Sequence, residues 1–83
     1  MKKMYKEITV QDCIELKEKF DKYTETAEQH EFPILLMVDI RLTNTINIIT
    51  ETNKVKDQKE ARAMFRTVLR VIGEDYSEYK EWL

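Results

Sequence analysis

Turn-forming and reactive residues are scarce in this 83-residue sequence, which contains one Gly, one Pro, one Cys and one His. A β-sheet protein of this length needs several tight turns, and tight turns draw heavily on Gly and Pro. The scarcity of both therefore favours helices. The single Cys13 excludes an internal disulfide, and one Cys with one His excludes the usual Cys/His zinc sites. The length allows one domain, spanning residues 1–83.

Long apolar runs are also missing. The longest, Ile34 to Val38, has five residues, whereas about 20 are needed to cross a bilayer. Four of the first seven residues are charged, and this start lacks the apolar stretch of a signal peptide. An unpaired thiol fits a reducing compartment. We therefore expect a cytoplasmic protein with no membrane partner.

A first helix is predicted over residues 10–29. Thr9 can cap its amino end, and Asp12 lies in the first turn, where a carboxylate opposes the positive end of the helix dipole. Spacings of three and four residues then place one apolar seam along the helix. The seam consists of Cys13, Leu16, Phe20, Tyr23, Ala27 and His30. Pro33 follows, and the residue before a proline is pushed out of helical geometry, so the helix should end there.

Residues 34–52 allow two interpretations. As a β-hairpin, alternate residues from Ile34 to Leu42 are apolar, and the many Thr and Ile residues favour strands. As a helix, one stripe is apolar and the opposite stripe, with Asp39, Thr43 and Asn47, is polar. The apolar stripe, which should then be buried, consists of Leu35, Val38, Leu42, Ile46 and Ile49. A two-residue hairpin turn would need positive φ near Thr43, where no glycine is present. We favour the helix, with Pro33 in its first turn.

A third helix is predicted over residues 57–72. Asp57 and Glu60 form its capping pattern, and Gly73 follows at the position where a left-handed residue costs least. Its predicted core face, with Leu69 at the margin, consists of Ala61, Met64, Phe65, Val68 and Ile72. A short last helix should follow from Asp75. The predicted fold class is all-α, a small bundle of three longer helices and one short C-terminal helix; the alternative is α+β, with the hairpin at residues 34–52.

Charge is unevenly distributed in the sequence. The net charge of the chain is −2, but residues 54–72 carry six basic and two acidic side chains, and residues 73–83 carry one basic and four acidic. Four of the basic residues fall within one quarter of the circumference of the third helix, and we call them the basic stripe. They are Lys59, Arg62, Arg66 and Arg70. Arginines at i, i+4 and i+8 repel one another mildly, which suggests a counter-charge, and their planar groups suit carboxylate or phosphate.

Catalytic chemistry has little support in the sequence. Cys13 and His30 are seventeen residues apart on the predicted first helix, about 25 Å at 1.5 Å per residue, so they cannot form a nucleophilic pair. Glutamate pairs such as Glu15/Glu18 resemble half of a helical Mg²⁺ site, but the predicted second helix supplies no matching pair. We expect no enzyme activity, no catalytic residue, no metal and no cofactor.

The last eleven residues form an acidic segment with three aromatic side chains. Tyr76, Tyr79 and Trp82 are spaced at i, i+3 and i+6, and Tyr and Trp dominate binding hot spots. They can equally close one end of the core. Two copies placed antiparallel would set the basic block of one against the acidic end of the other, so we expect a homodimer with Tyr79 and Trp82 at the contact.

The sequence as a whole predicts a small intracellular protein that acts by binding. We expect a regulator or inhibitor that binds a protein partner with an acidic surface stoichiometrically, through the basic stripe and the aromatic segment. Bacteriocin immunity proteins and modulators encoded by phages and mobile elements are analogous in size and architecture, but no sequence motif links this chain to them. The alternative is a nucleic-acid-binding regulator that uses the basic face of residues 57–72. Nucleic acid is the less favoured partner, because the chain lacks overall basicity.

Overall fold

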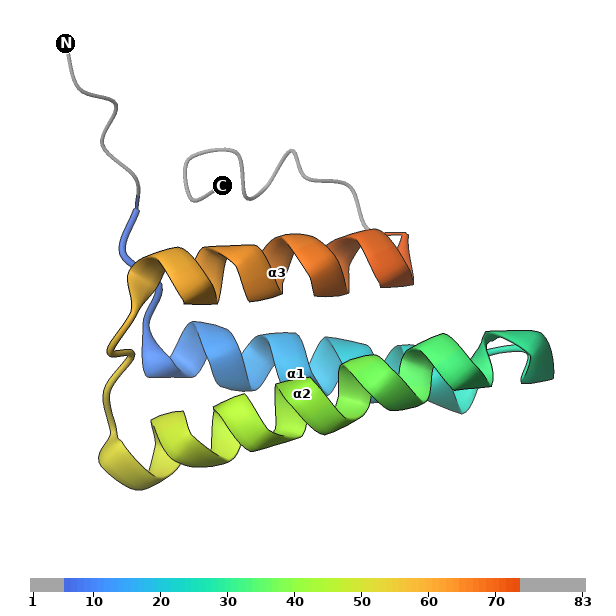
Figure 1. Ribbon diagram of the computed structural model, residues 1–83, viewed down its shortest axis with the longest axis horizontal. Helices are drawn as coiled ribbons and strands as arrows, with labels where there is room; N and C mark the ends of the chain where they lie inside the picture. Colours follow the sequence, from blue (N-terminus) through green and yellow to red (C-terminus); the bar gives the residue numbers. More distant parts are fainter. Residues whose placement is uncertain (1–5, 74–83) are drawn as a thin grey trace, which may run out of the picture.

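The described part of the protein, residues 6–73 of a computed structural model, is all-α. It contains α1 (Val10–Glu25), the short 3-10 helix η1 (Gln29–Glu31), α2 (Phe32–Thr52) and α3 (Gln58–Ile72). The α-helices run up, down and up, and α1 packs against both α2 and α3 (Figure 1). The predicted bundle of three longer helices is confirmed. The expected fourth helix lies outside the described residues.

The ends of α1 show one confirmed and one wrong prediction. Thr9 and Asp12 form a capping box, in which each side chain accepts from the other residue's backbone N–H. The helix ends at Glu25 rather than near residue 29. The hydroxyl of Thr24 donates to the carbonyl of Asp21, and that of Thr26 donates to the carbonyl of Tyr23. Thr side chains that bond nearby backbone groups compete with helix propagation, and this explains the early end.

The apolar seam predicted for the first helix therefore divides between two elements. Cys13, Leu16 and Phe20 are buried, and Tyr23 and Ala27 are partly buried. His30 lies in η1 and is exposed. Pro33 marks the beginning of α2, as the helical interpretation requires, and Phe32 before it is already helical.

Residues 34–52 belong to one continuous helix, so the hairpin alternative is wrong. The Thr residues that favoured strands are accommodated inside the helix: the hydroxyls of Thr50 and Thr52 donate to the carbonyls of Ile46 and Ile48. The left-handed residue that ends α2 is Asn53, with φ of 52°. Asn tolerates this conformation better than most residues.

The burial predicted for α2 is largely confirmed. Four of the five stripe residues are buried and Val38 is partly buried. Asp39 and Thr43, which were expected to be exposed, are half-buried. These two side chains are partly covered because they contact other groups of the bundle. Asp39 lies 3.7 Å from the Lys17 ammonium of α1 and accepts a hydrogen bond from Thr43. Asn47 is exposed, as predicted.

The limits of α3 are confirmed, but its orientation differs from the prediction. The Asp57 carboxylate accepts the Glu60 backbone N–H, and Gly73 ends the helix with φ of 72°. Leu69, expected at the margin, is fully buried, whereas Met64 and Ile72, expected in the core, are only half-buried. Met64 lies beside α2 rather than in the core.

The core lies between the three helices and includes one residue that precedes them. Ile8 is 1% exposed. Its backbone N–H donates to the Gln58 side-chain oxygen at 2.7 Å, and its carbonyl accepts from the Gln58 amide nitrogen at 2.8 Å. This pair of hydrogen bonds attaches the N-terminal segment to the first turn of α3.

Candidate functional site

The reactive side chains are not arranged for catalysis in the described structure. The Cys13 thiol is buried, and desolvation together with the Asp12 carboxylate raises its pKa to about 11. Such a thiol is a poor nucleophile at neutral pH, because the thiolate is the reactive form. His30 lies on a different element, with its side chain exposed beside Glu28. Within residues 6–73 no three His, Cys, Asp or Glu side chains are grouped to hold a metal ion.

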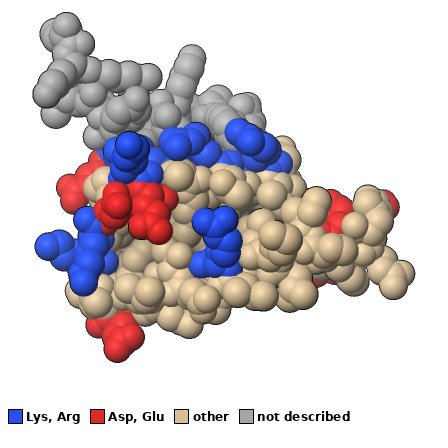
Figure 2. All heavy atoms as spheres, viewed as in Figure 1, with Lys and Arg blue, Asp and Glu red and all other residues tan. Residues whose placement is uncertain are grey.

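The basic stripe follows the outer side of α3, where Figure 2 shows basic side chains along one edge of the molecule. Its end residues, Lys59 and Arg70, are exposed. Arg62 and Arg66 are half-buried, and each interacts with other groups of the chain. The two ends of the stripe are therefore its most exposed charges. Tyr76, Tyr79 and Trp82, the other predicted binding residues, lie outside the described residues.

A larger exposed surface, which the sequence analysis missed, lies on α2. Six large apolar side chains of the helix are between 50 and 68% exposed. They are Phe32, Ile34, Leu36, Met37, Ile40 and Ile48. The broad, mainly uncharged area below α3 in Figure 2, with basic atoms near its centre, belongs to this side of the bundle. The amino-terminal part of α2 extends past the end of α3, so α3 cannot cover it (Figure 1).

Exposed apolar residues at this density are unusual for a monomer. Complete burial of one such side chain contributes about 1.5–3 kcal/mol, so covering the exposed half of six would contribute several kcal/mol. A helix that is apolar on all sides is normally buried on all sides. The signal was present in the sequence, because residues 34–38 are apolar at every position. Periodicity analysis looks for one apolar face and gives no weight to a second.

A groove separates α2 from α3 on the side away from α1. Its volume is about 400 Å³, and its lining is mainly apolar. The principal lining residues are Ile34, Met37, Val38, Met64, Val68 and Val71. The groove exists because α1 packs against both neighbours while α2 and α3 diverge from each other. It occupies the place that a further helix would fill in a four-helix bundle.

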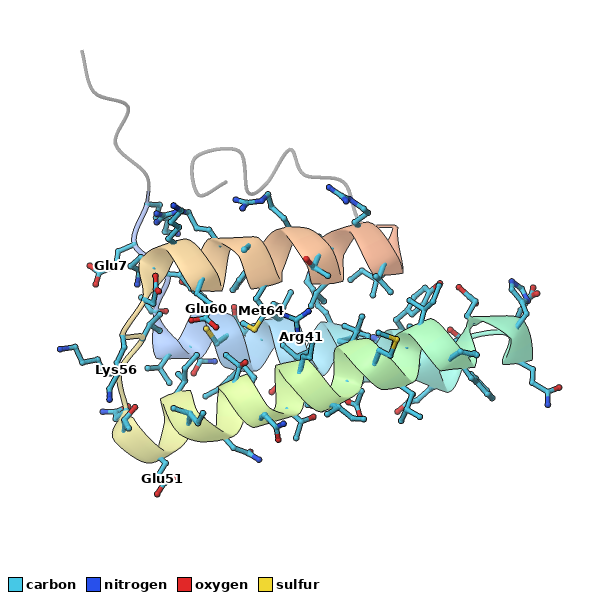
Figure 3. All side chains as sticks on the ribbon, viewed as in Figure 1. Glu7, Arg41, Glu51, Lys56, Glu60 and Met64 are labelled. Atoms are coloured by element: carbon cyan, nitrogen blue, oxygen red, sulfur yellow. The ribbon has the colours of Figure 1, made fainter. Side chains whose placement is uncertain are left out.

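Two charged side chains border this groove. Arg41 extends from α2 and Glu60 from α3 into the space between the two helices, with Met64 between them (Figure 3). No described residue forms an ion pair with either side chain. A charge beside an apolar surface fixes the position and orientation of whatever docks there, because an uncompensated charge is costly once solvent leaves.

The segment Gln29–Thr52, which joins η1 to α2, is long and apolar enough to span a membrane by length and composition alone. Its mean hydropathy reaches 1.4 over 18 residues, and 22% of that window is buried in the bundle. Asp39 and Arg41 lie at its midpoint. Each would cost about 2.5–3.5 kcal/mol at the centre of a bilayer. A protein surface therefore suits α2 better than a membrane interior.

Comparisons with protein-family models, with curated proteins and with solved structures found no match to this chain.

Proposed function

We propose that this protein is a small intracellular regulator or inhibitor that binds a protein partner stoichiometrically, with the groove between α2 and α3 as its docking site. The observation that carries the proposal is the groove itself, apolar along its length and bordered by Arg41 and Glu60. An amphipathic helix that docks in an apolar groove is a common mode of protein recognition. The partner would supply that helix.

The chemistry of the partner follows from the charges. An acidic side chain next to its apolar face would pair with Arg41, and a basic one would pair with Glu60. The exposed ends of the basic stripe, Lys59 and Arg70, lie on the same helix as Met64 and would attract an acidic surface around the docked helix. Charges of this kind increase the association rate and fix the register, while the apolar lining supplies affinity.

Site-specific cross-linking tests the docking site. Met64→benzoylphenylalanine places a photoreactive group in the groove, and Lys22→benzoylphenylalanine places it on the exposed surface of α1. In cells of the source organism we expect one protein adduct at position 64 and none at position 22. Equal adducts at both positions, or none at position 64, would contradict the proposal.

Affinity measurements on the captured partner complete the test. We expect a 1:1 complex by titration calorimetry. Arg41→Glu should weaken binding tenfold or more, which corresponds to about 1.4 kcal/mol. Lys22→Glu, the same charge reversal at an exposed site outside the groove, should leave the affinity unchanged. An unchanged affinity for Arg41→Glu would remove the groove from the interaction.

The alternative function, nucleic-acid binding, predicts a different outcome, which a DNA-binding measurement can detect. Binding of duplex DNA through the basic stripe would weaken steeply with salt, because phosphate contacts release counterions. We expect no measurable duplex binding at physiological salt. Micromolar binding that is lost in the Lys59→Glu/Arg70→Glu double variant would favour nucleic acid. These two exposed positions are chosen because Arg62 and Arg66 interact within the chain.

A further inference from the structure

One end of the groove between α2 and α3 lies where α3 ends. Val71 lines the groove, and Gly73 ends the helix two positions later. The φ of Gly73 is 72°, and its backbone N–H donates to the carbonyls of Leu69 and Arg70. A left-handed residue at this position is a common way for a chain to leave a helix and change direction. Residues 74–83 therefore continue the chain from one end of the groove.

The length of this segment matches the length of the groove. Ten residues follow the left-handed glycine. A turn of about three residues is enough to join antiparallel helices, which leaves residues 76–83 for a helix of about 12 Å. The lining on α3 runs from Val71 to Glu60, about 16 Å at 1.5 Å per residue. A helix antiparallel to α3 would reach the level of Met64 and leave Glu60 uncovered beyond it (Figure 3).

The pattern of side chains in the segment suits an apolar groove. On a helix its four large apolar and aromatic side chains would share about one third of the circumference, opposite its glutamates. The first group consists of Tyr76, Tyr79, Trp82 and Leu83, and the second of Glu74, Glu78 and Glu81. Each Tyr or Trp can bury about 150–250 Å². Packing of the glutamates on the basic stripe would expose the apolar group to water, and exposed ion pairs compensate poorly.

Charge also favours this segment as the occupant. Residues 74–83 carry four acidic side chains and one basic one. Arg41 lines the groove on α2, and Arg70, the neighbour of Val71 in the sequence, is exposed. With the apolar group in the groove, the glutamates stay in solvent at the rim, where basic residues attract them without a cost of burial. The acidic lining residue, Glu60, lies beyond the end of the helix.

We propose that residues 74–83 of this chain pack in the groove between α2 and α3 as a fourth helix, antiparallel to α3. The segment is attached at the end of the groove, so its effective concentration there is about millimolar. Tyr79 and Trp82, expected from the sequence at a homodimer contact or at one end of the core, are placed along the groove instead. The packing is independent of the proposed function. Its consequence, competition with the partner's helix for the same lining, rests on that function.

The fluorescence of Trp82, the single tryptophan, tests the packing in the full chain. We expect a blue-shifted emission, and quenching by acrylamide severalfold weaker than that of N-acetyltryptophanamide. Met37→Glu should abolish both effects, because Met37 lines the groove, and it is 68% exposed, so the fold does not depend on it. Leu36→Glu is the matched control. Leu36 is the adjacent residue, 61% exposed and outside the groove lining, so this variant should resemble the wild type. Circular dichroism checks that both variants are folded.

Four results would overturn the packing. The first is a wild type in which Trp82 is quenched as readily as the free compound, and the second is an equal effect of Met37→Glu and Leu36→Glu. The third is a loss of protection on dilution, which would assign the groove to the segment of a second copy. The fourth is protection that is lost in Lys59→Glu/Arg70→Glu but kept in Met37→Glu, because this would place the segment on the basic stripe.

Tyr79→Ser, which should release the segment, tests the competition with the partner. An occupied groove lowers the apparent affinity in proportion to the fraction of molecules whose groove is open. We therefore expect Tyr79→Ser to bind the partner severalfold more tightly than the wild type. An unchanged affinity would contradict the competition. If Arg41→Glu also leaves the affinity unchanged, the proposed function fails, whereas the fluorescence of Trp82 still decides the packing.

Discussion

Glu31 joins three segments through one carboxylate. One of its oxygens accepts the Tyr23 hydroxyl from α1, and the other accepts the Glu28 backbone N–H at 2.9 Å, while the residue itself begins the turn into α2. The hydrogen bond from Tyr23, followed by that from Glu28, lowers the pKa of Glu31. The same contact raises the pKa of Tyr23. The connection between α1 and α2 therefore depends on the charge of one half-buried residue.

Acid should loosen this connection. Because folding lowers the pKa of Glu31 from its ordinary value of 4.5, its contribution to stability is present above pH 4.5 and is lost as pH falls through the folded pKa. We expect Glu31→Gln to have a lower Tm than the wild type at pH 7, and the difference to close between pH 4.5 and pH 3. Thermal unfolding followed by circular dichroism measures this.

The control is Glu25→Gln, which removes an exposed carboxylate at the end of α1. Its Tm difference from the wild type should be small and should change little with pH. A Glu31→Gln difference that stays constant from pH 7 to pH 3 would show that the charge of Glu31 has no part in the connection.

At the scale of elements, Gln58 forms a polar contact between distant parts of the chain. Its amide forms two hydrogen bonds with the backbone of Ile8, fifty residues away, and so holds a buried side chain over the core. A hydrogen bond typically contributes about 0.5–1.5 kcal/mol, and the loss of a partner for a partly buried group costs more. The contact therefore determines whether the segment before α1 remains attached.

Replacement of Gln58 should show this contribution directly. We expect Gln58→Ala to lower the free energy of unfolding by about 2 kcal/mol, because both the N–H and the carbonyl of Ile8 lose their partners. Gln11→Ala, the same change on the exposed side of α1, should cost well under about 1 kcal/mol. Urea denaturation measures both. An equal loss of unfolding free energy in the two variants would show that the hydrogen bonds between Gln58 and Ile8 contribute little to stability.

The sequence predicted those features that local chemistry determines. The caps at Thr9, Asp57 and Gly73 depend on residues within one turn, and all three are confirmed. The early end of α1 was missed because Thr24 and Thr26 compete with the helix through weak side-chain hydrogen bonds. The contact between Gln58 and Ile8 was missed because no local pattern connects residues fifty apart.

At the scale of the whole molecule, the missed features follow from how the helices lie against one another. The packing of α3 in the bundle buries Leu69 and places Met64 in the groove. Both residues are apolar, and two adjacent apolar rows on one helix cannot indicate which faces the core. The sequence analysis proposed the basic stripe as a binding surface but did not predict the groove, since the groove arises from apolar residues that the bundle leaves uncovered.

Two residues on α2 provide a test of this arrangement. Ile40 is 54% exposed and Leu42 is 1% exposed, although they are only two positions apart. Side chains two positions apart point to opposite sides of a helix but to the same side of a strand.

Leu42→Ala should lower the free energy of unfolding by about 2–5 kcal/mol, because it leaves a cavity in the core. Ile40→Ala should cost less than about 1 kcal/mol, partly because Ala favours helices more than Ile does. Denaturation at low micromolar concentration limits self-association, so that the loss reflects the single chain. Similar losses for the two variants would mean that residues 40 and 42 share one face, and the helix α2 would then be wrong.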